Sequence, residues 1–302
     1  MSTLYTQAES NVRKTWFYLT GFFIFVILLG WFISRLVGSY IVFWIAVIYS
    51  ILASFFSYWY SDKIVLAMNR AKRIKKEDNP EIYRLVENLC ITAGIPVSKI
   101  YIIPEDQPNA FATGRDNQHA AIAITQGLID KLERVELEGV LAHEISHIKN
   151  KDILLSTVIV VLVGIVSVLV DFLFRINFYR GFETRDDENN EQGGLILLLF
   201  SLILLILAPL VATLIKLAIS RKREFLADAS GALLTRYPEG LARALEKISQ
   251  DQTPMKVANN STAHLYIASP FKGKQTKSWL TKLFSTHPPI EERIKALREM
   301  EV

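Results

Sequence analysis

Four long stretches without Asp, Glu, Lys or Arg constrain the fold of this 302-residue chain more than any other feature. They are residues 15–34, 36–61, 153–170 and 192–215. A helix that crosses about 30 Å of hydrocarbon needs about 20 residues, at ~1.5 Å per residue. Three stretches are long enough, whereas the third has 18 residues before Asp171, so a shallow or tilted crossing stays open for it. The pattern predicts a helical membrane protein with four spans.

Basic residues flank the predicted spans unevenly, and this sets the expected orientation. Clusters of Lys and Arg precede the first span, follow the second and follow the fourth, at 13–14, 63–76 and 221–223. The connections on the other side carry fewer basic residues or mix them with acidic ones. Because Lys and Arg near membrane ends stay cytoplasmic, both termini and both soluble segments are predicted to be cytoplasmic. These clusters also account for the net charge of +4, so no nucleic-acid partner is predicted.

The soluble material falls into two segments, 62–152 and 220–302, separated by the membrane hairpin 153–219 and preceded by the hairpin 1–61. We expect the two segments to form one domain. Asn79-Pro80 predicts a helix start and Gly94 a helix end. Residues 99–103 and 120–125 are short, apolar and rich in β-branched side chains, which predicts strands. The predicted fold is mostly α with a small β-sheet.

A His-Glu-x-x-His motif lies at 143–147, immediately before the third apolar stretch. Residues four apart share one face of a helix, so His143 and His147 can bind one Zn²⁺ with Glu144 beside the bound water. The plainer interpretation is an ordinary helix with two polar residues at this spacing. A catalytic zinc needs a third protein ligand, and Glu224 follows the fourth span with Asp228 one helical turn later. Glu224 can bind the metal and Asp228 can accept the outer N–H of a ligating imidazole, although a solvated acidic pair would look the same.

Three other features near the motif have both a structural and a functional interpretation. The motif helix is expected over 135–149, with Asn150 ending it in the left-handed conformation and Asp152 capping the next helix. For Asn150 and Asp152, helix capping is a simpler role than catalysis, and capping is the role that we expect. The small-residue segment at 109–114 predicts either an edge strand that binds an extended peptide or a plain hairpin arm.

The chain resembles the HtpX-type membrane zinc metalloproteases in four motifs that occur in the same order. They are Asn109-Ala110-Phe111-Ala112-Thr113-Gly114, His143-Glu144-x-x-His147-x-x-Asn150-x-Asp152, Arg223-Glu224-x-x-Ala227-Asp228, and Ser285-Thr286-His287-Pro288-Pro289 followed by Arg293. The resemblance implies a gluzincin-like site in which one Zn²⁺ is bound by His143, His147 and Glu224, with Glu144 catalytic. It places Asp228, Asn150 and Asp152 behind the ligands.

The same resemblance assigns further roles and a cellular task. It implies that Asn109, Ala110, Phe111 and Ala112 form a wall of the substrate cleft, and it points to His287 and Arg293 as catalytic. A group held rigidly before Pro288 can stabilise an oxyanion, although His287 can equally be a capping or core residue. The expected substrates are membrane proteins or unfolded polypeptides, in quality control and stress response at the bacterial inner membrane.

Two rival functions use the same residues. A prenyl-protein processing protease would share the zinc chemistry, but that branch of the family has about seven spans around a large chamber. A membrane adaptor or chaperone with a vestigial zinc site would need no catalysis, and it predicts an eroded motif. The intact Glu144, Glu224 and Asp228 favour the endopeptidase.

Overall fold

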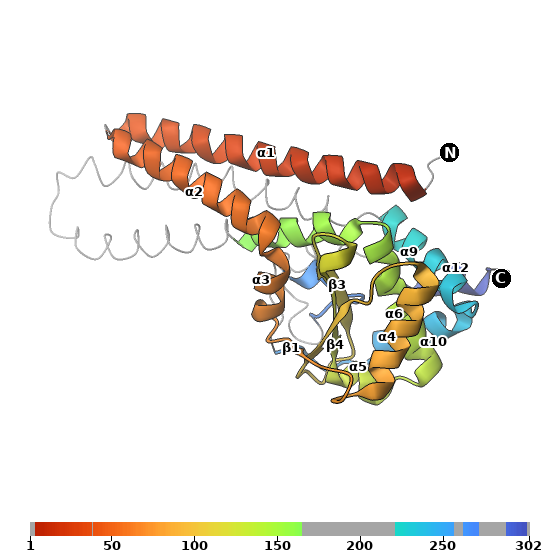
Figure 1. The fold of residues 1–302 in the computed structure, drawn as a ribbon. Helices are drawn as coiled ribbons and strands as arrows, with labels where there is room; N and C mark the ends of the chain where they lie inside the picture. The colour runs from red at the N-terminus through yellow and green to blue at the C-terminus, as the bar shows by residue number, and fades with distance from the viewer. Residues whose placement is uncertain (1–3, 38, 165–220, 257–261, 272–287, 301–302) are drawn as a thin grey trace.

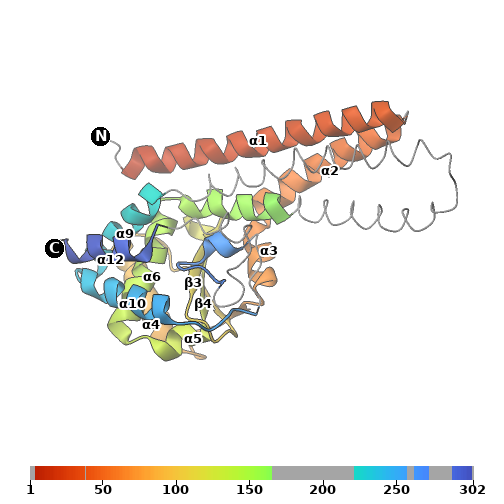
Figure 2. The same cartoon turned by 180° about the vertical axis from the view of Figure 1, so that it is seen from behind.

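The computed structural model describes residues 4–37, 39–164, 221–256, 262–271 and 288–300. Its first two helices, α1 (Leu4–Val37) and α2 (Tyr40–Trp59), pack side by side, and the ends that they share extend beyond the sheet domain (Figures 1 and 2). The fourth apolar stretch and His287 lie outside the described residues.

No single helix among the described residues is both long and apolar enough to cross a membrane. The segment Phe43–Trp59 of α2 and the helix α3 (Ser61–Met68) are long and apolar enough together, as a pair bent by 79°. The apolar helix Asp152–Gly164 is shorter. The four spans therefore stay a prediction.

The sheet has four strands in the order β1-β2-β4-β3. Its strands are β1 (Lys72–Arg73), β2 (Lys99–Ile103), β3 (Ala110–Gly114) and β4 (Ala120–Thr125). β2 pairs parallel with β4, whereas β1 and β3 pair antiparallel at the two edges. The two predicted strands are confirmed at their exact ends, and the segment at 109–114 supplies the edge strand β3.

The start and end of α4 (Pro80–Ala93) follow directly from local sequence. The side chain of Asn79 accepts a hydrogen bond from the amide of Ile82, and Pro80 occupies the first helical position, where no amide donor is required. Gly94 ends the helix with φ 73°, a conformation that side chains other than glycine rarely adopt. The predicted capped helix is confirmed.

Alternate residues of β4 face two different layers, as the period of a strand requires. Ile122 and Ile124 pack in the main core, which includes α4 and α6 (Arg134–Lys149). Ala121 and Ala123 pack on the other face with Tyr266 and residues of α3. The small alanines allow close approach there, so the sheet lies between two apolar layers.

The described parts of the segments 62–152 and 220–302 pack on one another around α6 (Figure 1). From the second segment, α9 (Arg221–Thr235) and α10 (Pro238–Gln250) contact α6, while α12 (Ile290–Arg298) contacts α9 and α10. Smaller elements are α5 (Gln126–Lys131) and the short 3-10 turns η1 (Asn117–His119) and η2 (Ala263–Leu265). Because α6 is covered by α9, α10, β3 and α4, 11 of its 16 residues are buried.

Candidate metal centre

α6 brings the two histidines of the motif together at the centre of the domain. Its first turn is fixed by a reciprocal capping box between Glu133 and Glu136. The rings of His143 and His147 are perpendicular, with centroids 4.7 Å apart and Nε2 atoms 3.2 Å apart. Two nitrogens that bind one tetrahedral zinc at about 2.0–2.1 Å would lie roughly 3.3 Å from each other. The two imidazoles therefore fit a shared metal ion.

Glu224 supplies the third candidate ligand from α9, far away in the sequence. Its carboxylate oxygens lie 3.5 Å from His147 Nε2 and 3.9 Å from His143 Nε2. One donor atom from each of the three side chains falls within 4.8 Å of the others. Two imidazoles and one carboxylate are a ligand set that zinc takes in catalytic sites, where a fourth position stays open for water.

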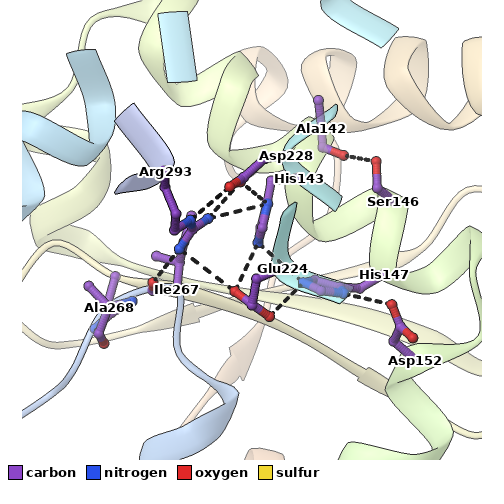
Figure 3. A network of polar contacts seen from close by, with 11 residues as sticks. Ala142, His143, Ser146, His147, Asp152, Glu224, Asp228, Ile267, Ala268 and Arg293 are labelled. Carbon is purple, nitrogen blue, oxygen red and sulfur yellow. Dashed lines mark hydrogen bonds and ion pairs between the residues drawn. The ribbon is translucent and has the colours of Figure 1, made fainter. Parts of the chain in front are cut away.

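The outer nitrogen of each histidine contacts a carboxylate, as Figure 3 shows. His143 Nδ1 lies 2.9 Å from Asp228, and His147 Nδ1 lies 3.0 Å from Asp152. An Nδ1–H that donates to a carboxylate leaves the Nε2 lone pair free for a metal. Both pairs therefore favour the tautomer that metal binding requires.

The structure corrects the capping roles predicted for the end of α6. Asn150 does end the helix, but with φ −81° it is not left-handed; Lys151 is, with φ 57°. The next helix begins at Asp152 itself, so Lys151 occupies the position expected for the cap. The reason is that the turn at Lys151 brings the Asp152 carboxylate within 3.0 Å of His147, five residues earlier in the chain.

The charges around the two outer carboxylates shift the pKa values of His147 and Asp228 in opposite directions. Burial alone would lower the pKa of His147, but the Asp152 hydrogen bond and the charge of Glu224 raise this pKa to about 9. Burial alone would raise the pKa of Asp228, but Arg293 and the His143 hydrogen bond lower this pKa to about 2. Asp228 is therefore ionised at neutral pH.

Arg293 is fully buried behind the candidate ligands rather than exposed in a cleft. Its Nε and one terminal nitrogen donate to Asp228 at 2.8 and 2.7 Å, and the other donates to the Ile267 carbonyl at 3.2 Å. That last nitrogen also lies 3.7 Å from Glu224. These contacts suit a residue that positions Asp228 and Glu224, and the catalytic role predicted for Arg293 stays a prediction.

Glu144 is almost completely buried beside the histidines. Burial raises its pKa, while the nearby His143 and His147 and an amide hydrogen bond from Ala112 act in the opposite direction. The Ala112 contact comes from β3, so the edge strand directly adjoins the Glu144 carboxylate. A carboxyl group with a raised pKa is suited to accept and return a proton.

The segment that starts at Asn109 makes extensive contacts within the protein. All five residues of β3 are buried. The Asn109 side chain donates to the Ala268 carbonyl at 2.9 Å, and the Ala110 carbonyl accepts from Ile267 at 3.1 Å. Phe111 packs edge-on against Tyr266. These contacts occupy the outer edge of β3 at its start, and the substrate-binding role of Asn109, Ala110, Phe111 and Ala112 stays a prediction.

Sequence reasoning missed two features that hold the site together. The chain at Ile267 and Ala268 fixes both Arg293 and the start of β3, but an irregular segment carries no periodic signal. Gly231 is the second feature. A β-carbon there would lie 3.0 Å from the His143 amide nitrogen, so the glycine allows α9 to approach α6 at the metal-binding turn.

Replacing Gly231 with alanine is expected to weaken zinc binding about tenfold, because α9 must move and carry Glu224 with it. Competition with a fluorescent chelator measures this affinity. Gly21→Ala is the matched control, since a β-carbon on that helical glycine meets nothing within 4 Å. Equal zinc affinities in the two variants would show that the close approach is not required.

Asp152→Ser tests whether Asp152 orients the imidazole of His147 or only stabilises the start of the next helix. Serine is also favoured at helix starts but lacks the carboxylate that contacts His147 Nδ1. We expect a 10–100-fold loss of zinc affinity, roughly the effect of removing other outer partners of ligating histidines. Unchanged affinity with a lower thermal unfolding midpoint would assign Asp152 to helix stability.

Comparison with known proteins gives a consistent result. The family model described as Peptidase family M48 matches residues 76–301. Protease HtpX homologs from Dictyoglomus turgidum and Streptococcus gordonii are 47% and 44% identical to the chain. These alignments cover 99% and 98% of this chain, and 95% and 100% of the two relatives.

A crystal structure of S. mikatae Ste24p is similar at a TM-score of 0.49 and 19% identity, over 97% of this chain and 66% of that one. The family match, in contrast, extends over most of the chain and takes in all three candidate ligands and Glu144. The protein therefore belongs to peptidase family M48 and is a metalloprotease that hydrolyses peptide bonds.

Proposed function

We propose that the protein is a zinc endopeptidase of the bacterial inner membrane that cuts membrane proteins and unfolded polypeptides on the cytoplasmic side. The observation that carries this proposal is the group of His143, His147 and Glu224 beside the buried Glu144. The donor set and the 3.2 Å separation of the imidazole nitrogens fit one zinc per chain.

Zinc in such a site supplies a Lewis acid that lowers the pKa of water toward ~7 and polarises a peptide carbonyl. In the proposed reaction, Glu144 accepts the proton of the attacking water and then donates it to the leaving amine. The Ala112 amide holds the Glu144 carboxylate in place. Asp228 and Asp152 fix the histidine tautomers, and Arg293 holds Asp228.

Surface composition supports placement of the first two helices in a bilayer. Most of the exposed large apolar side chains of the described chain belong to α1 and α2, including Trp16, Phe17, Ile41, Trp44 and Ile45. An exposed apolar surface of this extent is typical of a membrane or protein contact. The uncharged stretches and their basic flanks favour the membrane.

The position of the site suits substrates that reach it from the bilayer. Only Asn150 and Lys151 separate α6 from the apolar helix Asp152–Gly164. With Asp152 contacting His147, that helix begins next to the metal centre. Cleavage in cytoplasmic loops or at juxtamembrane sites follows, and a role in membrane-protein quality control and stress response is consistent with the HtpX homologs among its relatives.

Reconstituted vesicles test the substrate class and the orientation together. A membrane protein with known topology is incorporated with the protease, and cleavage sites are mapped by mass spectrometry beside an unfolded soluble protein added outside. We expect cuts in cytoplasmic loops and in the soluble chain when the domain faces outward. Cuts confined to periplasmic loops would overturn the proposed topology, and exclusive cutting of the soluble chain would overturn the membrane substrates.

A further inference from the structure

A pocket that is separate from the metal centre lies where α2 meets the sheet domain. Its volume is about 510 Å³, and its lining includes Phe55, Trp59, Lys63, Lys99 and Arg115. These residues come from α2, α3, β2 and the turn after β3, so the pocket is built by segments distant in the sequence. Its volume falls within the ~300–1,000 Å³ range of small-molecule sites.

Positive charge predominates in this pocket. Lys63 and Lys99 are exposed and form no ion pair with any residue that the structure describes. Arg115 contacts Asp116 and His119, which also contact each other. The one carboxylate in the lining is Asp62. Two lysines are thus left to bind an anionic group.

The other side of the pocket is aromatic. Phe55 and Trp59 belong to the last turns of α2, and the guanidinium of Arg115 lies 4.4 Å from the centroid of the Trp59 ring. Lys63 likewise lies 5.0 Å from the Tyr60 ring. Aromatic rings near basic side chains are typical of the level at which a chain leaves a bilayer.

The chain geometry places this pocket at such an exit point. The second uncharged stretch ends at Ser61, and Asp62 and Lys63 are the first charged residues after it. The axis also bends by 79° between α2 and α3 at this position. Apolar contact with α2 and positive charge beyond it match an amphipathic ligand that lies along α2.

We propose that this pocket binds the phosphodiester headgroup of an anionic phospholipid, with Lys63 and Lys99 on the phosphate and Phe55 and Trp59 against the acyl chains. The proposal rests on the membrane placement of α1 and α2 in the proposed function, but not on peptide hydrolysis. It commits to a lipid rather than a free phosphate ester because three of the eight lining residues, Phe55, Trp59 and Tyr60, are large aromatic residues at the end of the second uncharged stretch.

Native mass spectrometry of the full chain in detergent tests the proposal, with phosphatidylglycerol and phosphatidylcholine as probes. The Glu144→Ala background prevents self-cleavage. We expect one phosphatidylglycerol bound at least tenfold more tightly than phosphatidylcholine. In Lys63→Gln/Lys99→Gln this affinity falls about 25-fold, at about fivefold per lysine.

Lys72→Gln/Lys75→Gln is the matched control, because it removes the same charge from exposed lysines outside the pocket. We expect its affinity for phosphatidylglycerol to change less than twofold and both double variants to keep the thermal unfolding midpoint of the parent. Equal losses in the two variants would overturn the site in favour of diffuse attraction. Displacement of the lipid by glycerol 3-phosphate would overturn the lipid assignment in favour of a free phosphate ester.

The mass-spectrometric measurement of lipid binding does not depend on peptide hydrolysis. A failed lipid test therefore leaves the protease assignment intact. Conversely, loss of lipid binding together with cleavage confined to periplasmic loops in the vesicle experiment would place the error in the membrane topology.

Discussion

Replacing Glu144 with alanine is expected to lower the rate of peptide cleavage by at least about 10³-fold while zinc stays bound at one per chain. Glu144 is not one of the three clustered donor side chains, so its loss leaves the metal site intact. The proton transfer from water and to the amine is what disappears. Two measurements on the same detergent preparation check this prediction. Plasma emission spectrometry gives the zinc content, and cleavage of an unfolded protein gives the activity.

His143→Ala and His147→Ala are the contrasting variants, because each removes a candidate ligand and should lose zinc and cleavage together. Equal zinc loss in all three variants would refute separate roles for Glu144 and the histidines. If the wild type and Glu144→Ala both bind zinc and neither cuts, the adaptor function is favoured. Undiminished cleavage by Glu144→Ala would remove Glu144 from the mechanism.

Arg293→Met is expected to cause the largest loss of stability among the site variants. Arg293 is fully buried and Asp228 is 1% exposed, so the variant leaves a buried carboxylate without its cation. Breaking such a pair by removing one partner costs about 3–5 kcal/mol. For a domain of this size, the thermal unfolding midpoint should fall by roughly 10 °C.

Arg298→Met is the matched control on the same helix. Arg298 pairs with Glu239 and Glu246, but all three side chains are exposed, and solvent screens such pairs strongly. Its midpoint should stay near that of the wild type. The double variant Asp228→Asn/Arg293→Met should recover part of the loss, because no unpaired charge remains. Equal midpoints for Arg293→Met and Arg298→Met would contradict the argument.

The pKa of Asp228 determines the pH at which the stability of Arg293→Met should be measured. Arg293 and His143 hold this pKa at about 2, below the ordinary value of ~3.9. A carboxyl group with a lowered folded-state pKa stabilises the fold above its unfolded pKa and loses this contribution as the pH falls through the folded value. The contribution of the pair is therefore complete at neutral pH, where Arg293→Met should be compared with the wild type.

Local sequence signals predicted the secondary structure around the site. The cap at Asn79, the left-handed Gly94 and the β-branched strands 99–103 and 120–125 each depend on contacts between near neighbours. The His-Glu-x-x-His spacing likewise depends only on the helical period. Such features are readable because the interacting groups lie within a few residues of each other.

Other features depended on residues that are far apart in the sequence. The residues at 109–114 predict either an edge strand that binds an extended peptide or a plain hairpin arm, and in the structure Ile267 and Ala268 bond to Ala110 and Asn109. No sequence pattern around 109–114 predicts a contact with a residue more than 150 positions away.

The sequence by itself determined the metal-binding helix, the residue types of a zinc site, two strands of the small sheet and the apolar stretches, because period, charge and capping chemistry are local. Only the tertiary structure decided that Asp228 contacts the imidazole of His143, that Arg293 is buried against Asp228, and that Gly231 lets α9 reach α6. These contacts depend on how distant helices pack, and packing is set by the shapes of many side chains at once.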